Sequence, residues 1–150
     1  MSGLAQHSNT PLAAPVAAPR AGSVGQPAAL DSARLAQLHK ALADTLRLQT
    51  LRLLRNESFG VLELCRLLDM RQSALSHHLK VLAKAELVAT RREGNSIFYR
   101  RAFISDDDSL AALKRAAFDT VDELAIPEAQ AQQLSALQKE RSELSLSFFE

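Results

Sequence analysis

The 150-residue chain has no tryptophan, one tyrosine and a single cysteine, Cys65. One cysteine cannot form an intramolecular disulfide, which excludes a disulfide-stapled secreted scaffold and favours a reducing compartment. No apolar run approaches the roughly 18 residues that a membrane-spanning helix needs. The N-terminus also lacks the charged and unbroken apolar regions of a signal peptide. We therefore expect a cytoplasmic protein without a membrane segment.

Glycine and proline are scarce and unevenly distributed. Four of the five prolines and three of the five glycines lie within residues 1–30, among alanine, serine and glutamine. This composition leaves little to bury, so we interpret residues 1–30 as a disordered Ala/Pro-rich tail. After residue 30 only Gly60, Gly94 and Pro127 remain, which predicts a mostly helical body.

The chain has almost no net charge, but the balance hides an asymmetry. The total is +1, from 18 Lys and Arg against 17 Asp and Glu. Residues 61–103 hold eight bases and four acids, a charge of +4, whereas residues 104–150 hold four bases and ten acids, a charge of −6. Such a basic middle beside an acidic end suggests a module that faces nucleic acid.

Hydrophobic periodicity divides the first part of the body into helices. Apolar residues recur at three- and four-residue spacing, and Asp31 or Ser32 can cap the first helix. We predict helices over 31–42, 45–55, 62–69 and 71–86. Phe59, Gly60 and Val61 are interpreted as a short extended link.

The period then changes from helical to alternating. Residues 87–92 alternate, the turn Glu93-Gly94-Asn95-Ser96 follows, and residues 97–99 are strand formers, which together predict a β-hairpin. A helix is predicted after the acids at 106–108 and another after Pro127. The last helix has a heptad-like seam at 130–148, expected to pack on the body or on a partner subunit.

This element order predicts the fold class. Helices followed by a hairpin indicate a mainly α protein with a small β-hairpin, a winged helix–turn–helix with an extra C-terminal helix. We place the DNA-binding and dimerisation domain at 31–125 and the C-terminal helix at 126–150.

The predicted helix over 71–86 has two faces. Leu75, Leu79 and Leu82 fall within one narrow arc at 100° per residue, and a polar, cationic face lies opposite. Such a face can enter a major groove with its first residues on base edges, and a glutamine can pair bidentately with adenine. We predict base contacts by Gln72, Ser73, Ser76 and His77.

The hairpin concentrates arginine. Arginines paired across two strands would repel each other unless a polyanion lay nearby, and Arg91, Arg92, Arg100 and Arg101 all lie on this hairpin. Phosphate contacts position a protein on DNA, whereas base contacts specify the sequence. We predict backbone contacts by Arg71, Lys80, Arg91, Arg92, Asn95 and Arg100.

These residues resemble a known family. Residues 41–47, Glu63-Leu64-Cys65, residues 73–82 and the glycine loop before Phe98-Tyr99 resemble ArsR/SmtB-type transcriptional regulators over residues 33–125. The resemblance implies a bacterial, homodimeric repressor that binds double-stranded DNA at an inverted-repeat operator until an inducer binds. It also implies a dimer interface that includes Leu35, Leu38, Leu42, Leu110, Leu113 and Ala117.

The sequence departs from this family's metal sites. Where the family has Cys-x-Cys on the third helix, this chain has Cys65 followed by Leu67, and the helix after the hairpin has no histidine. A thiolate metal site usually needs three or four protein ligands. We therefore predict no cofactor, no metal site and an unknown small-molecule effector. Core packing is expected for Cys65, and the alternative is a metal- or thiol-redox-sensing repressor that uses Cys65.

Other function classes fit less well. The chain shows no Gly-rich phosphate loop, no Ser-His-Asp grouping and no paired carboxylates in a cleft-like context, so we do not expect an enzyme. The seam at 130–148 fits a helical protein-interaction module, but that interpretation leaves the Arg-rich hairpin unexplained.

Overall fold

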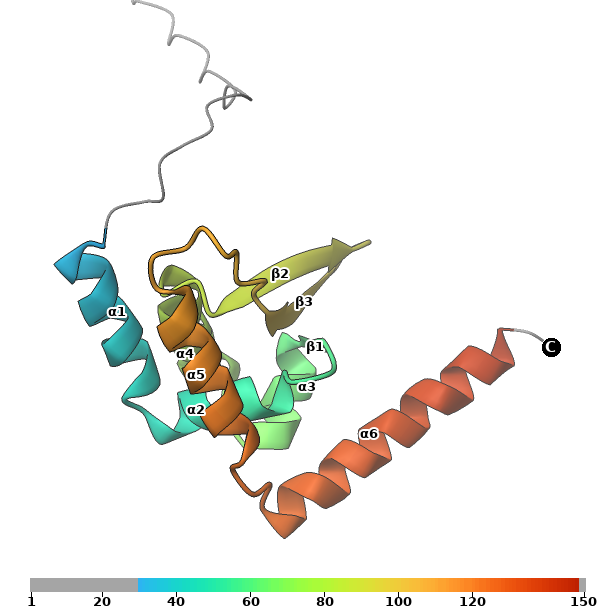
Figure 1. The fold of residues 1–150 in the computed structure, drawn as a ribbon. Helices are drawn as coiled ribbons and strands as arrows, with labels where there is room; N and C mark the ends of the chain where they lie inside the picture. The colour runs from blue at the N-terminus through green and yellow to red at the C-terminus, as the bar shows by residue number, and fades with distance from the viewer. Residues whose placement is uncertain (1–29, 149–150) are drawn as a thin grey trace, which may run out of the picture.

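The computed structural model describes residues 30–148 (Figure 1). The tail interpreted at 1–30 therefore falls almost wholly outside the described residues. The described chain runs, in order, through α1 (Ser32–Leu42), α2 (Thr45–Leu53), β1 (Phe59–Gly60), α3 (Val61–Leu68), α4 (Gln72–Lys84), β2 (Val88–Glu93), β3 (Ser96–Arg101), α5 (Ala111–Asp122) and α6 (Glu128–Ser147).

The helices begin where the sequence supplies acceptors for their first N–H groups. The Asp31 carboxylate accepts the Ala33 N–H at 3.0 Å, and the Asp44 carboxylate accepts the Arg47 N–H at 3.1 Å. These are N-caps, which each stabilise a helix by about 1 kcal/mol. Between α3 and α4 the chain reverses through Asp69, whose φ of +51° lies in the left-handed region that aspartate tolerates. The resulting short turn joins α3 and α4 as a helix–turn–helix.

The core lies where these helices meet the start of β2. It is built almost entirely from leucines, with Phe59 fully buried among them. Leu75, Leu79 and Leu82 on α4 are each at most 1% exposed, which confirms the predicted apolar face of this helix. Full burial of one such side chain stabilises the fold by about 1.5–3 kcal/mol, so α4 is held firmly by one side.

The sheet has three strands in the order β1-β3-β2. β2 and β3 form the predicted antiparallel hairpin, whose turn uses Gly94 at a φ of +57°. Phe59 and Gly60 form a third strand opposite Tyr99 and Phe98, and are not merely an extended link as expected. Two residues are too few to show the alternation that marks a strand. Their pairing also depends on β3, which lies far along the chain.

The last two helices lie on different sides of the fold. α5 packs on α2, whereas α6 leaves the body after Pro127 and runs beside α3 (Figure 1). The predicted seam of α6 is covered over its first part, where Gln130 and Leu137 are buried, but Leu144 and Phe148 are exposed. Over residues 30–148, no helix is both long and apolar enough to span a bilayer.

Candidate nucleic-acid interface

The face of α4 opposite the core carries the predicted base-reading residues. Gln72, Ser73 and His77 are exposed and Ser76 is half-buried. The N-cap is Arg71, whose guanidinium is a donor only and makes no cap hydrogen bond. The positive end of the α4 dipole is therefore open to an anionic group such as a phosphate.

The hairpin presents cations on both of its faces. Arg91 and Arg100 lie on one face and Arg92 lies on the other, and all three are exposed, as is Asn95 in the turn. Arg91 forms an ion pair of 2.6 Å with Glu93, and both side chains are more than half exposed. An ion pair this exposed is worth little, so a phosphate can replace the glutamate.

The strand register corrects the argument from arginine repulsion. Arg91 lies opposite Phe98, Arg92 opposite Ile97 and Arg100 opposite Ala89, so no arginine of the hairpin faces another across the strands. The predicted repulsion is wrong, because a pairing shift by a single residue changes every cross-strand neighbour. The exposure of these arginines, and not their pairing, supports a polyanionic partner.

Arg101 belongs to the base of the hairpin and does not face solvent. Its guanidinium donates to the Leu51 carbonyl at 2.9 Å and to the Asp122 carboxylate at 2.6 Å, and lies 4.7 Å from the Phe118 ring centroid. Burial would raise the pKa of Asp122, but the hydrogen bond and charge of Arg101 outweigh it and hold that pKa below its usual value. Arg101 thus joins the hairpin to α2 and α5.

A buried polar cluster fixes α4 against the first two helices. Arg47 is 8% exposed and donates to the carbonyls of Lys40 and Ala41, both at 2.8 Å. The same guanidinium lies 3.2 Å from Nδ1 of His78, and Asp44 lies 3.8 Å from that ring. His78 of α4 is therefore part of this polar cluster.

A second cluster joins α1, the end of α4 and the start of α5. Lys114 is 2% exposed and donates to Asp108 at 2.6 Å and to Glu86 at 3.1 Å. Arg34 contacts the same two carboxylates at 3.1 and 2.7 Å. The acids at 106–108 were interpreted as a simple helix start. Asp108 does accept the Leu110 N–H at 3.0 Å, but it is also the centre of this ion network.

The predicted dimer residues divide into two groups. Leu38 is 1% exposed and Leu110 is 5% exposed, because both side chains lie in the core of the protomer itself. They hold α1 and α5 in place and offer almost no surface to a partner. Leu35, Leu42, Leu113 and Ala117 remain at least partly exposed.

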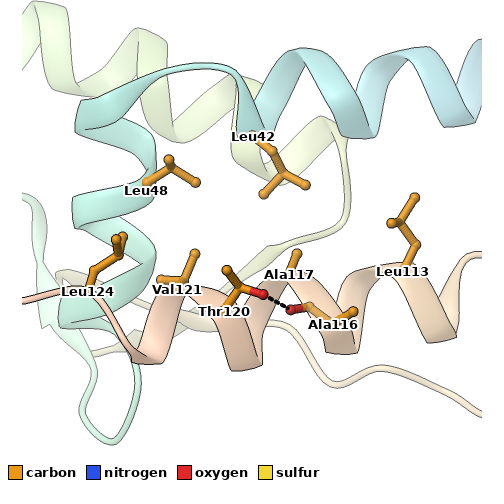
Figure 2. Close-up of a pocket in the computed structure, with 8 residues that line it drawn as sticks. All are labelled: Leu42, Leu48, Leu113, Ala116, Ala117, Thr120, Val121 and Leu124. Atoms are coloured by element: carbon orange, nitrogen blue, oxygen red, sulfur yellow. Dashed lines mark hydrogen bonds between the residues drawn. The ribbon is translucent and has the colours of Figure 1, made fainter.

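Three of those residues line an apolar groove. The groove has a volume of about 350 Å³ and lies between α5 and the ends of α1 and α2 (Figure 2). Its lining is almost wholly aliphatic, with Thr120 as the one hydroxyl. The residues are Leu42, Leu48, Leu113, Ala116, Ala117, Thr120, Val121 and Leu124.

Cys65 lies on α3 and is half-buried against the core. Burial raises the pKa of its thiol above the ordinary value, which disfavours the reactive thiolate. Within residues 30–148, no three His, Cys, Asp or Glu side chains are grouped so that they could hold a metal ion. The absence of a metal site stays a prediction from the sequence.

Known proteins resemble this chain over the helix–turn–helix and the elements around it. Residues 44–90 match the model of the family described as bacterial regulatory protein, arsR family. The arsenical resistance operon repressor of Staphylococcus aureus is 40% identical over 82 residues, which cover 53% of this chain and 76% of that protein. The chain belongs to the ArsR family. The biofilm growth-associated repressor of Agrobacterium fabrum is 43% identical over 84 residues, or 56% of this chain and 68% of that relative.

The ArsR-family assignment agrees with the fold. The homodimeric winged helix–turn–helix DNA-binding domain Mb0332 of Mycobacterium bovis superimposes with a TM-score of 0.51 at 34% identity, over 69% of this chain and 92% of that one. The transcriptional activator HlyU of Vibrio cholerae is 44% identical over 69 residues, 46% of this chain and 64% of its own length. The chain is therefore a winged helix–turn–helix regulator, and its relatives include an activator as well as repressors.

Proposed function

We propose that this ArsR-family protein is a homodimeric, sequence-specific repressor that acts in the bacterial cytoplasm. It binds an inverted-repeat operator and is released by a small-molecule effector other than a metal ion. The observation that carries the proposal is the exposed polar face of α4 beside the exposed arginines of the hairpin. The opposite side of α4 is buried in the core, so this helix presents one defined face to a partner.

The two parts of this surface have different roles. Gln72, Ser73, Ser76 and His77 present amide, hydroxyl and imidazole groups suited to base edges in the major groove. The cations Arg71, Lys80, Arg91, Arg92 and Arg100, with Asn95, contact phosphates. Base contacts choose the site, whereas phosphate contacts supply most of the affinity and make it depend on salt.

A second copy of this chain covers the apolar groove between α5 and the ends of α1 and α2. The groove is aliphatic and open, and Leu113 and Leu124 within it are 37% and 40% exposed in the isolated protomer. The homodimeric state of the M. bovis domain supports this occupant. A two-fold axis here would present two copies of α4 to successive major grooves, which requires an operator with two half-sites.

The effector proposal rests on the side chains available to a ligand. Cys65 is the chain's single thiol, and its raised pKa disfavours the thiolate that a soft metal or an oxidant would need. Two of the acids near α5 already have cationic partners, because Asp108 pairs with Lys114 and Asp122 pairs with Arg101. A metal that used Asp108 or Asp122 would have to displace these pairs, which favours an organic effector.

One experiment tests the central claim. Duplexes selected from a random library by the purified protein should share an inverted repeat, and fluorescence anisotropy should show much tighter binding to them than to scrambled duplexes. Gln72→Ala should reduce that preference by roughly 1–3 kcal/mol if Gln72 contacts a base. Equal losses on selected and scrambled duplexes would contradict base reading. Native mass spectrometry of the protein as isolated would show its subunit number and any bound metal or small molecule.

A further inference from the structure

Arg141 lies on α6, near the end of the part of this helix that packs on the body, and makes several contacts there. The Arg141 guanidinium grips both carboxylate oxygens of Glu63 on α3, at 3.1 and 2.6 Å. It also donates to the Ser58 carbonyl at 3.1 Å and lies 4.9 Å from the ring centroid of buried Phe59. Glu57 lies 3.5 Å away on the same segment. The Arg141 side chain therefore connects α6 to the segment before β1, to β1 itself and to α3.

Glu63 links Arg141 to the hairpin through β1. The carboxylate oxygen that Arg141 holds at 2.6 Å also accepts the Gly60 N–H at 2.8 Å, which caps α3. Gly60 in turn pairs with Phe98 of β3, and Phe98 pairs with Arg91 of β2. An unbroken series of contacts thus links Arg141 to an arginine that the proposed function places on DNA phosphate.

We infer that Arg141 is a positioning residue for DNA binding: it clamps Glu63 and β1, and β1 sets the position of the hairpin on the DNA backbone. This inference rests on the proposed role of the hairpin arginines. Without the clamp, β1 loses its outer support and the hairpin samples positions from which its arginines reach fewer phosphates.

A second ion pair between the same two helices provides a matched control. Arg66 on α3 and Glu140 on α6 are joined by two contacts of 3.2 Å, and their side chains are 55% and 53% exposed. Arg141 and Glu63 are only 34% and 25% exposed. The Arg66–Glu140 pair involves the same helices and charges but lies outside the contacts that lead to β1. Its loss should leave DNA binding unchanged.

The direction in which Glu63→Gln changes DNA affinity distinguishes a positioning role from a purely electrostatic one. Glu63→Gln removes a negative charge near a DNA-facing surface, so electrostatics alone would strengthen binding. Glutamine can still accept the Gly60 N–H and cap α3, because Glu and Gln both serve at this position. If Arg141 positions the hairpin through Glu63, Glu63→Gln must weaken binding in spite of its more favourable charge.

The experiment measures the affinity of full-length variants for a selected duplex across a salt series. Arg141→Ala and Glu63→Gln should each weaken binding about three- to tenfold and lower the magnitude of the log–log salt slope by about two, the equivalent of one lost phosphate contact in each subunit of the dimer. The double variant should lose little more DNA affinity than either single variant, because both changes break the same Arg141–Glu63 contact. Amides of β3 should also exchange faster in both variants. Glu140→Gln, the control with the same charge change, should match the wild type.

The outcomes separate this inference from the proposed function. If Arg91→Ala with Arg92→Ala leaves affinity and slope unchanged, the proposed role of the hairpin fails, and the inference fails with it. If that double variant loses affinity but Glu63→Gln binds as tightly as Glu140→Gln or tighter, only the positioning role of Arg141 is wrong. Should Arg141→Ala fold poorly, Glu63→Gln alone decides the question.

Discussion

The ion network around Asp108 predicts a pH-dependent contribution to stability. Burial by itself raises the pKa of this carboxyl, but hydrogen bonds from Lys114, the Leu110 N–H and Arg34 outweigh it and lower that pKa from 3.8 to about 2. A tenfold change in proton affinity corresponds to about 1.4 kcal/mol. The ionised Asp108 should therefore contribute roughly 2–3 kcal/mol to the free energy of unfolding at pH 7.

The sign follows from the direction of the shift. The folded protein binds the Asp108 proton more weakly than the unfolded chain does, so the stabilisation is complete above the unfolded pKa. It is lost as the pH falls through the folded value, between about pH 5 and pH 1, and just over half should remain at pH 3. Asp108→Asn removes the charge, while the amide oxygen can still accept the Leu110 N–H at the start of α5.

Urea unfolding compares Asp108→Asn with the wild type at equal protomer concentration. Their free energies of unfolding should differ by the full contribution of Asp108 at pH 7 and by less at pH 3. The neighbouring Asp107→Asn makes the same charge change at an exposed position and should alter stability by no more than about 0.5 kcal/mol. A cost for Asp108→Asn that is the same at both pH values, or no larger than that of the control, would refute the reasoning.

Four further predictions concern binding, assembly and reactivity. His77→Ala should cost roughly 1–3 kcal/mol on a selected duplex and much less on a scrambled one, as measured by anisotropy. Arg91→Ala with Arg92→Ala should lower the magnitude of the salt slope by about four, because two phosphate contacts are lost in each subunit of the dimer, and an unchanged slope would remove these residues from the interface. Leu113→Lys should give a monomer by light scattering, because it places a charge in the apolar groove. Finally, the Cys65 thiol should react with a thiol reagent at pH 7 more slowly in the folded protein than in urea, because burial raises its pKa.

Local patterns in the sequence were sufficient for the fold class and for the face of α4. A leucine every three or four residues identifies a buried helical face, and the residues between them must then face outward. This is why Leu75, Leu79 and Leu82 were predicted correctly as core. The hairpin was equally visible, because its turn and its strand formers are adjacent in the chain.

Buried charges are what the sequence could not reveal. Arg47, Arg101 and Lys114 look like ordinary surface cations, and each is instead enclosed by partners from other elements. Arg101 lies 50 residues from Leu51, whose carbonyl it binds. No local pattern encodes such a contact, because it depends on how distant elements pack. The same reason hid the third strand and the burial of Leu38 and Leu110 within the protomer.

By itself, the sequence determined a basic helix–turn–helix and hairpin followed by an acidic C-terminal part, since charge and periodicity are local properties. Only the tertiary structure decided which of the basic residues stay exposed. Arg101 is neutralised by Asp122, whereas Arg91, Arg92 and Arg100 stay exposed. The physical reason is that burial and ion pairing join residues that are remote in sequence, so the set of exposed cations follows from the packing as much as from the composition.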